Sequence, residues 1–135
     1  ATEALSLAIQ AATEPGDRVA VPEPGYFGYA LALEALGREA APVATDPYQG
    51  WAIDALEDLL WEDSRVRAVI IDPSVANPTG ACMSVETKRR LLAACARRET
   101  RVIEDHSFAP LAFSRGAPLS SISRRVPHGC SSADL

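Results

Sequence analysis

The segment AVIIDPSVANPTG at residues 68–80 decides the fold that this sequence predicts. It begins with an unbroken apolar run, as strands buried on both faces of a parallel sheet require. Asn77-Pro78 follows this run, so we expect the Asn77 amide at the carboxyl end of a strand. The next apolar run, Arg101–Ile103, leads into acidic residues and places Asp105 at the same edge. Ligands bind at that edge in open parallel α/β sheets.

Strand-like and helix-like segments alternate along the chain. The expected strands are Arg18–Val21, Ala40–Ala44, Arg67–Ile71 and Arg101–Glu104. Apolar residues at helical spacing predict a helix before the first strand, helices over Tyr26–Leu36 and Ile53–Trp61, and one that Ser84 can cap. Thr45–Gly50 is interpreted as a loop. The alternation predicts an α/β fold, with a mainly parallel sheet flanked by helices.

Composition narrows the classes of function. The 135 residues carry a net charge of −5, which argues against a nucleic-acid surface in this segment, and no apolar run approaches the roughly 20 residues that span a bilayer. The paired arginines at 89–90 and 97–98 are interpreted as a solvated helix face. The three cysteines lack metal-type spacing, so we expect reduced thiols in a cytoplasmic protein and no metal site. The absence of a GxGxxG turn disfavours a dinucleotide-binding domain.

An amide donor beside a carboxylate suits a flat heterocycle with a phenolic oxygen and a ring nitrogen. In this respect the chain resembles fold-type-I aminotransferases of class I/II, which bind pyridoxal 5'-phosphate (PLP). The resemblance covers nearly the whole chain and rests on four segments in order: Ala1–Leu5, Pro24–Tyr29, Asn77–Gly80 and Glu104–His106. The last, with Pro110–Ala112 after it, resembles in particular the aminotransferase-like domains of bacterial MocR/GntR-type regulators. The resemblance implies the large domain of a PLP-dependent transferase.

The resemblance also implies a role for each residue of the cofactor site. Ala1 and Thr2 would hold the phosphate at a helix N-terminus, where unpaired N–H groups gather. Tyr26 would stack on the pyridine ring. Asn77 would donate to the phenolic oxygen, and Asp105 would accept from the ring N–H and keep that nitrogen protonated.

Simpler interpretations remain open for each of these residues. Thr2 can be an ordinary helix cap, and Asn77 an ordinary Asn-Pro turn. Tyr26 can be a core residue, with Phe27 as the stacking ring instead, and Asp105 can be a cap or turn residue. By the resemblance we also expect cis peptide bonds before the prolines of Glu23-Pro24 and Asn77-Pro78.

Two departures from the family pattern bear on activity. The Schiff-base lysine of the family follows the aspartate, whereas the one lysine here, Lys88, precedes it on an expected helix. The family usually has a tyrosine two or three residues after the aspartate, where this chain has Ser107 and Phe108. We therefore expect no catalytic residue in this chain. Residues 1–113 are interpreted as a piece of the large domain and residues 114–135 as a loop-like tail.

The sequence leaves three interpretations of function. The first is a fragment of a PLP-dependent aminotransferase that acts on an amino acid and whose full-length parent is a homodimer. The second is the effector-sensing PLP domain of a MocR-type transcriptional regulator, with a separate helix-turn-helix domain that binds DNA. The third is a standalone α/β binding module without PLP.

Overall fold

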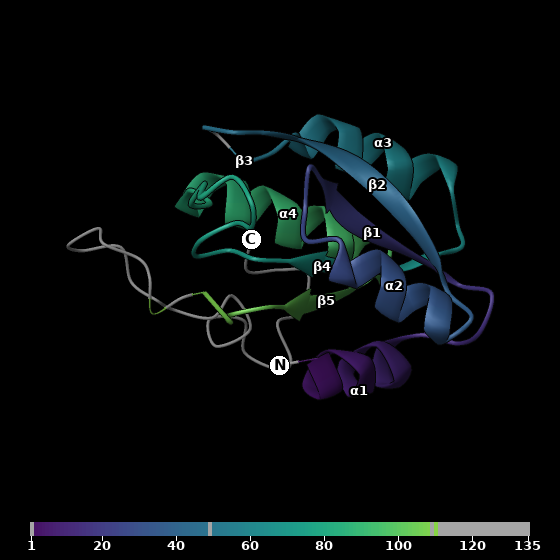
Figure 1. The fold of residues 1–135 in the computed structure, drawn as a ribbon. Helices are drawn as coiled ribbons and strands as arrows, with labels where there is room; N and C mark the ends of the chain where they lie inside the picture. Colours follow the sequence, from purple (N-terminus) through teal and green to yellow (C-terminus); the bar gives the residue numbers. More distant parts are fainter. Residues whose placement is uncertain (1, 49, 109, 111–135) are drawn as a thin grey trace.

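The computed structural model describes residues 2–48, 50–108 and 110, and its elements form three layers (Figure 1). Ala1, Cys130 and the tail expected at 114–135 lie outside the described residues. The strands are β1 (Arg18–Glu23), β2 (Glu39–Asp46), β3 (Gly50–Trp51), β4 (Val66–Ile71) and β5 (Arg101–Glu104). The helices are α1 (Thr2–Ala12), α2 (Gly28–Ala35), α3 (Ile53–Glu62) and α4 (Val85–Arg97).

The sheet has the order β3-β2-β1-β4-β5. Strands β2, β1, β4 and β5 are parallel, which confirms the predicted α/β fold with a mainly parallel sheet. The short β3 pairs antiparallel with the end of β2, where the sequence predicted only a loop. Two residues are too few to show a strand pattern, so β3 depends on its pairing with Thr45 and Asp46.

The connections leave β1 and β4 in opposite directions. The β1-α2-β2 unit runs to one side of the sheet, and the β4-α4-β5 unit runs to the other. Their helices cover opposite faces, so both crossovers have the same hand, as parallel βαβ units require. The strand order therefore reverses between β1 and β4, and a crevice opens at such a point at the carboxyl ends of the strands.

Two apolar layers fill the space between sheet and helices. One lies under α3 and α4, and the other under α1 and α2. Strand β4 supplies both: Val69 and Ile71 face the first layer, whereas Ala68 and Ile70 face the second. This burial on both faces explains the continuous apolar run of the sequence. Among the described residues, no helix is long and apolar enough to span a membrane.

Helix α4 begins where the sequence predicts. Ser84 caps the helix, because its Oγ accepts from the Thr87 N–H at 3.0 Å. The arginines of α4 are exposed, as predicted, and two of them also form ion pairs with α3. Arg90 pairs with Asp54 at 2.6 Å, and Arg97 pairs with Glu57 at 3.1 Å, so the two arginines bridge α4 to α3.

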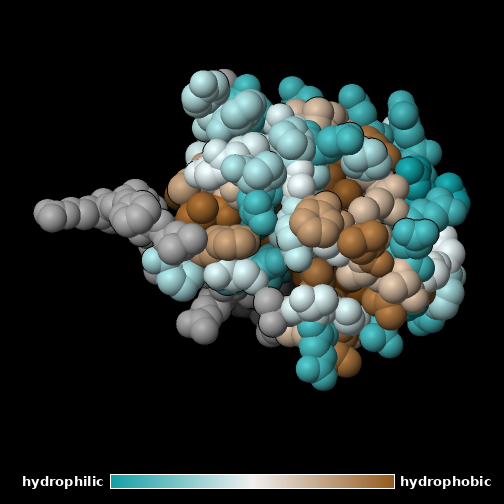
Figure 2. Space-filling model, in the orientation of Figure 1, coloured by the Kyte–Doolittle hydropathy of each residue, from teal (hydrophilic) through white to brown (hydrophobic). Residues whose placement is uncertain are grey.

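The outer surface of α2 is partly apolar, as the brown area over this helix in Figure 2 shows. Leu31 contributes to it with 57% of its surface exposed, whereas Leu33, two residues along the same helix, is fully buried. Because Leu31 and Leu33 are the same residue type on one helix, substitutions at the two positions compare the effect of burial on stability.

We expect Leu33→Ala to lower the free energy of unfolding by about 2 to 5 kcal/mol, because it leaves a cavity in the layer under α2. The matched control Leu31→Ala should change it by no more than about 0.5 kcal/mol. Urea unfolding followed by circular dichroism measures both. Equal effects of the two substitutions would contradict the packing of α2 described above.

Candidate functional site

Polar side chains gather at the carboxyl ends of β1, β4 and β5, which are neighbours in the sheet. The segments that leave these ends carry Tyr26, Asn77 and Asp105, respectively. The register pairs Ile71 of β4 with Glu104 of β5, so the residues after them emerge at the same level. The structure thus brings the three predicted residues to one edge of the sheet, at the point where the strand order reverses.

Asp105 is held by three hydrogen bonds. Its backbone N–H donates to the Ile71 carbonyl oxygen at 2.7 Å. Its Oδ2 accepts from the Tyr29 hydroxyl at 3.1 Å, and its Oδ1 accepts from the Ser107 N–H at 2.9 Å. Partial burial raises the pKa of Asp105, but the hydrogen bonds from Ser107 and Tyr29 outweigh it and hold the pKa below its ordinary value. The carboxylate is therefore ionised at neutral pH and still has lone pairs to offer a further donor.

Tyr29 connects Asp105 to Tyr26. The rings of Tyr26 and Tyr29 pack edge to face with their centroids 5.4 Å apart. Tyr29 is buried, and burial raises the pKa of its hydroxyl, helped by the charges of Asp72 and Asp105. It therefore remains a hydrogen-bond donor at every ordinary pH.

The half-buried ring of Tyr26 lies against Gly28. A Cβ at position 28 would clash with the Tyr26 ring, and a Cβ at Gly25 would clash with the Pro22 carbonyl oxygen. The backbone contact requires glycine at position 25, whereas a side chain at position 28 would displace the Tyr26 ring. Phe27, the alternative stacking ring, is exposed and tilted against Tyr26.

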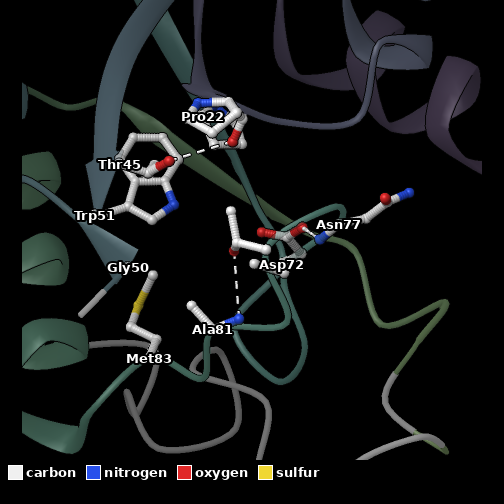
Figure 3. Close-up of a pocket in the computed structure, with 11 residues that line it drawn as sticks. Pro22, Thr45, Gly50, Trp51, Asp72, Asn77, Ala81 and Met83 are labelled. Atoms are coloured by element: carbon white, nitrogen blue, oxygen red, sulfur yellow. Dashed lines mark hydrogen bonds between the residues drawn. The ribbon is translucent and has the colours of Figure 1, made fainter. Parts of the chain in front are cut away.

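Asn77 is fixed through its backbone. Its N–H donates to Asp72 Oδ2 at 2.8 Å, and its side chain points away from the cavity drawn in Figure 3. Within the described residues, no hydrogen bond involves the Asn77 amide group. The peptide bonds Glu23–Pro24 and Asn77–Pro78 are both cis, as predicted.

Sequence reasoning missed Asp72, the one charged side chain in the buried set of the described residues. Burial raises its pKa to about 6, against the lowering effect of the hydrogen bond from Asn77. The sequence carries a signal for Asp72, because this residue ends an apolar run in the same way as the acidic residues before His106 do. Tyr29 falls within the helix expected over Tyr26–Leu36, and no spacing in the sequence marks it as a partner of Asp105.

Thr2 lies at the N-terminus of α1. The Arg101 guanidinium donates to the Ala12 carbonyl oxygen at 2.7 Å, so the C-terminus of α1 meets the start of β5. The helix runs antiparallel to β5 in Figure 1, which brings Thr2 to the end where β5 finishes. An open groove of about 630 Å³ separates α1 from β5 and reaches His106, which pairs with Glu104 at 2.8 Å. Ala1 lies outside the described residues.

Lys88 does not belong to this group. It lies in the first turn of α4, on the face of the sheet opposite α1 and α2. That Lys88 has no catalytic role stays a prediction. Among the described residues, no group of three or more His, Cys, Asp or Glu side chains is arranged to hold a metal ion.

The chain resembles known proteins over most of its length. The family model "Aminotransferase class I and II" matches residues 1–132. An uncharacterized HTH-type transcriptional regulator of Escherichia coli, YdcR, is 39% identical over 119 residues, which is 88% of this chain and 25% of the relative. Tyrosine aminotransferase of Bos taurus is 29% identical over 130 residues, which is 93% of this chain and 28% of the relative.

A solved structure gives the same result for the fold. The α-aminoadipate aminotransferase LysN of Thermus thermophilus, complexed with N-(5'-phosphopyridoxyl)-L-leucine, superposes with a TM-score of 0.69 and 31% identity. The match covers 77% of this chain and 26% of that protein. The chain spans about a quarter of the length of the relatives that it matches.

We expect Tyr29→Phe to raise the pKa of Asp105 and to cost about 1.5 kcal/mol of stability, because the carboxylate loses a buried donor. Carbon-detected NMR titration of the Asp105 carboxyl measures the pKa, and urea unfolding measures the stability. Tyr48→Phe is the matched control, since Tyr48 is 90% exposed. An unchanged Asp105 pKa in Tyr29→Phe would show that this hydrogen bond does not act in solution.

A pH dependence of stability follows from the pKa of Asp72, which is raised from 3.8 to about 6 in the folded state. The folded protein then binds the proton more tightly than the unfolded chain, so stability is lost as pH rises from about 4 to about 6. Asp72→Asn has no carboxyl group and so lacks this loss. Its free energy of unfolding, relative to that of the unmutated chain, should therefore rise by up to about 3 kcal/mol between pH 4 and pH 7. Urea unfolding across this range measures the difference. The control Asp58→Asn, at an exposed position, should show no such rise. A difference in the free energy of unfolding between Asp72→Asn and the unmutated chain that does not change with pH would refute the raised pKa.

Proposed function

Because the chain belongs to the aminotransferase class I and II family, and has the α/β fold of part of its large domain, we propose that it forms the PLP-binding edge of a protein that transaminates an amino acid. The observation that carries the proposal is the Asp105 carboxylate. It is kept ionised by Tyr29 and Ser107 at the carboxyl edge of the sheet, with an aromatic ring close by.

The residues present fit a pyridinium ring with a phenolic oxygen. Asp105 combines a lowered pKa with unused lone pairs, which suits a cationic ring N–H. Tyr26 is half-buried and follows Gly25, where a Cβ would clash with the Pro22 carbonyl oxygen. The Asn77 amide is fixed by its backbone yet makes no side-chain hydrogen bond among the described residues, so it is available as a donor.

We assign a separate task to each residue. PLP, when bound, supplies an electron sink for negative charge at the α-carbon of an amino-acid substrate. Asp105 holds the proton on the ring nitrogen, which this electron sink requires. Asn77 donates to the phenolic oxygen, and Tyr26 restrains the ring plane. Thr2, with Ala1 before it, offers N–H groups and a hydroxyl to the phosphate at the start of α1.

The lysine of the site comes from elsewhere in the full-length protein under this proposal. The one lysine of the chain, Lys88, lies across the sheet from Tyr26 and Tyr29. The full-length protein is also proposed to be a cytoplasmic homodimer. The free thiols of Cys82 and Cys95 support the reducing compartment.

A second candidate function has a specific observation in its favour. Two HTH-type transcriptional regulators of Escherichia coli, YdcR and YjiR, are 39% and 35% identical to this chain. The same residues would then hold PLP in an effector-sensing domain, and an amino-acid effector would replace the substrate. A DNA-binding domain encoded upstream of residue 1 would decide for the regulator. A standalone module without PLP has no observation in its favour.

We expect Asp105→Ala in the full-length protein to lower transamination by at least about 100-fold, because the ring nitrogen loses the group that keeps it protonated. Steady-state kinetics with a panel of amino acids measures the loss, and the PLP absorbance band shows whether cofactor remains bound. Asp58→Ala, a substitution of an exposed aspartate on α3, is the matched control and should leave the rate unchanged. Normal transamination by Asp105→Ala would refute the assignment of Asp105. Full cofactor loading without any transamination by the unmutated protein would favour the regulator.

A further inference from the structure

A small buried cavity lies beside the loop that carries Asn77. It is lined by residues of the β1 end, the β2–β3 hairpin and the loop after β4, and its volume is about 10 Å³ (Figure 3). That volume is room for about one water molecule. Asn77 contributes its backbone to the wall, because its side chain points away.

Two polar atoms on opposite walls of this cavity lack partners. Asp72 is 6% exposed and Trp51 is 7% exposed, and within the described part of the chain neither Asp72 Oδ1 nor Trp51 Nε1 has a hydrogen-bond partner. One atom is an acceptor and the other is a donor. A buried polar group without a partner costs about 1 to 3 kcal/mol, so two such atoms facing one cavity of this size point to a shared bridging molecule.

A water molecule would satisfy both atoms. Its oxygen would accept from the Trp51 N–H, and one of its hydrogens would be donated to the Asp72 carboxylate. Thr45 and Thr79 also line the cavity, but their hydroxyls already take part in hydrogen bonds with the Pro24 carbonyl oxygen and the Ala81 N–H. A metal ion does not fit the wall formed by the indole N–H, which is a donor only.

We propose that Asp72 is a positioning residue for Asn77. Its Oδ2 holds the Asn77 backbone, and its Oδ1 is tied through one buried water molecule to Trp51 of β3. The carboxylate thus links the loop after β4 to the β2–β3 hairpin, on the far side of β1. This link by Asp72, here called the anchor, rests on these contacts alone. Its effect on PLP binding rests on the function proposed above.

The water link is tested by a double-mutant cycle on stability at pH 7. Trp51→Phe keeps the ring and removes the donor, so we expect it to lower the folding equilibrium constant about fivefold. In the Asp72→Ala background the same substitution should lower it less than twofold, because the water has already lost its acceptor. Trp61→Phe, on an exposed tryptophan, is the control for the change of ring. Equal effects of Trp51→Phe in both backgrounds would overturn the link.

A crystal structure of the full-length protein tests the link without any variant. We expect a water molecule within hydrogen-bond distance of both Trp51 Nε1 and Asp72 Oδ1, and its absence in the crystal of Trp51→Phe. A dry cavity in the unmutated protein would overturn the proposal even if Asp72→Ala failed to fold.

The positioning role is tested by PLP affinity, measured by fluorescence titration of the full-length apoprotein. Asp72→Ala should weaken PLP binding about tenfold and add little to the loss caused by Asn77→Ala. Asp72→Asn retains an acceptor for the Asn77 N–H and should restore affinity to within about threefold. Unchanged affinity in a folded Asp72→Ala protein would overturn the positioning role. If the unmutated protein did not bind PLP, the proposed function would fail, whereas the anchor would still be decided by the stability cycle and the crystal.

Discussion

The pairing of β4 with β5 continues one residue beyond the strands, through the hydrogen bond from the Asp105 N–H to the Ile71 carbonyl oxygen. This bond sets the level at which Asp105 leaves the sheet, and the remaining polar contacts follow from it. The Asp105 carboxylate comes within reach of Tyr29, and Tyr29 in turn supports Tyr26. A slip of the register by one residue would turn Asp105 toward the opposite face, away from α1 and α2. The buried apolar residues of β4, with the half-buried Val102 and Ile103 of β5, oppose such a slip.

Two carboxylates at this edge have opposite environments. Asp105 receives a donor at each oxygen and has a lowered pKa, whereas Asp72 is more deeply buried and has a raised one. Burial, together with the charges of Asp72 and Asp105, raises the pKa of Tyr29 and keeps its hydroxyl protonated. The edge therefore holds one permanent anion, one carboxylate that takes up a proton more easily, and one permanent donor between them. Such a separation of roles among neighbouring titratable groups is typical of sites that handle protons.

The sequence predicts the strands and the positions of Asn77 and Asp105 because these depend on local pattern: apolar runs buried on both faces, with polar residues at their ends. It does not predict the contacts that support them. The Tyr29–Asp105 hydrogen bond joins residues 76 positions apart, and no spacing rule connects them. The pair of Trp51 and Asp72 depends on β3, a strand that exists only through tertiary pairing. The binding roles of Thr2, Tyr26, Asn77 and Asp105 stay predictions, because position at an edge does not by itself establish a ligand.

The burial of Cys95 makes thiol reactivity a measure of how often the helix layer opens. Burial raises its pKa to about 12, so the reactive thiolate is almost absent while α4 stays packed. Cys82, by contrast, is exposed at the surface of the loop that contains Asn77. With Cys130 replaced by serine, a thiol reagent would modify Cys82 in the closed protein, and Cys95 only when α4 separates from the sheet. The two thiols would thus report local unfolding by their different reactivities, with Cys95 in the core and Cys82 on the loop that contains Asn77.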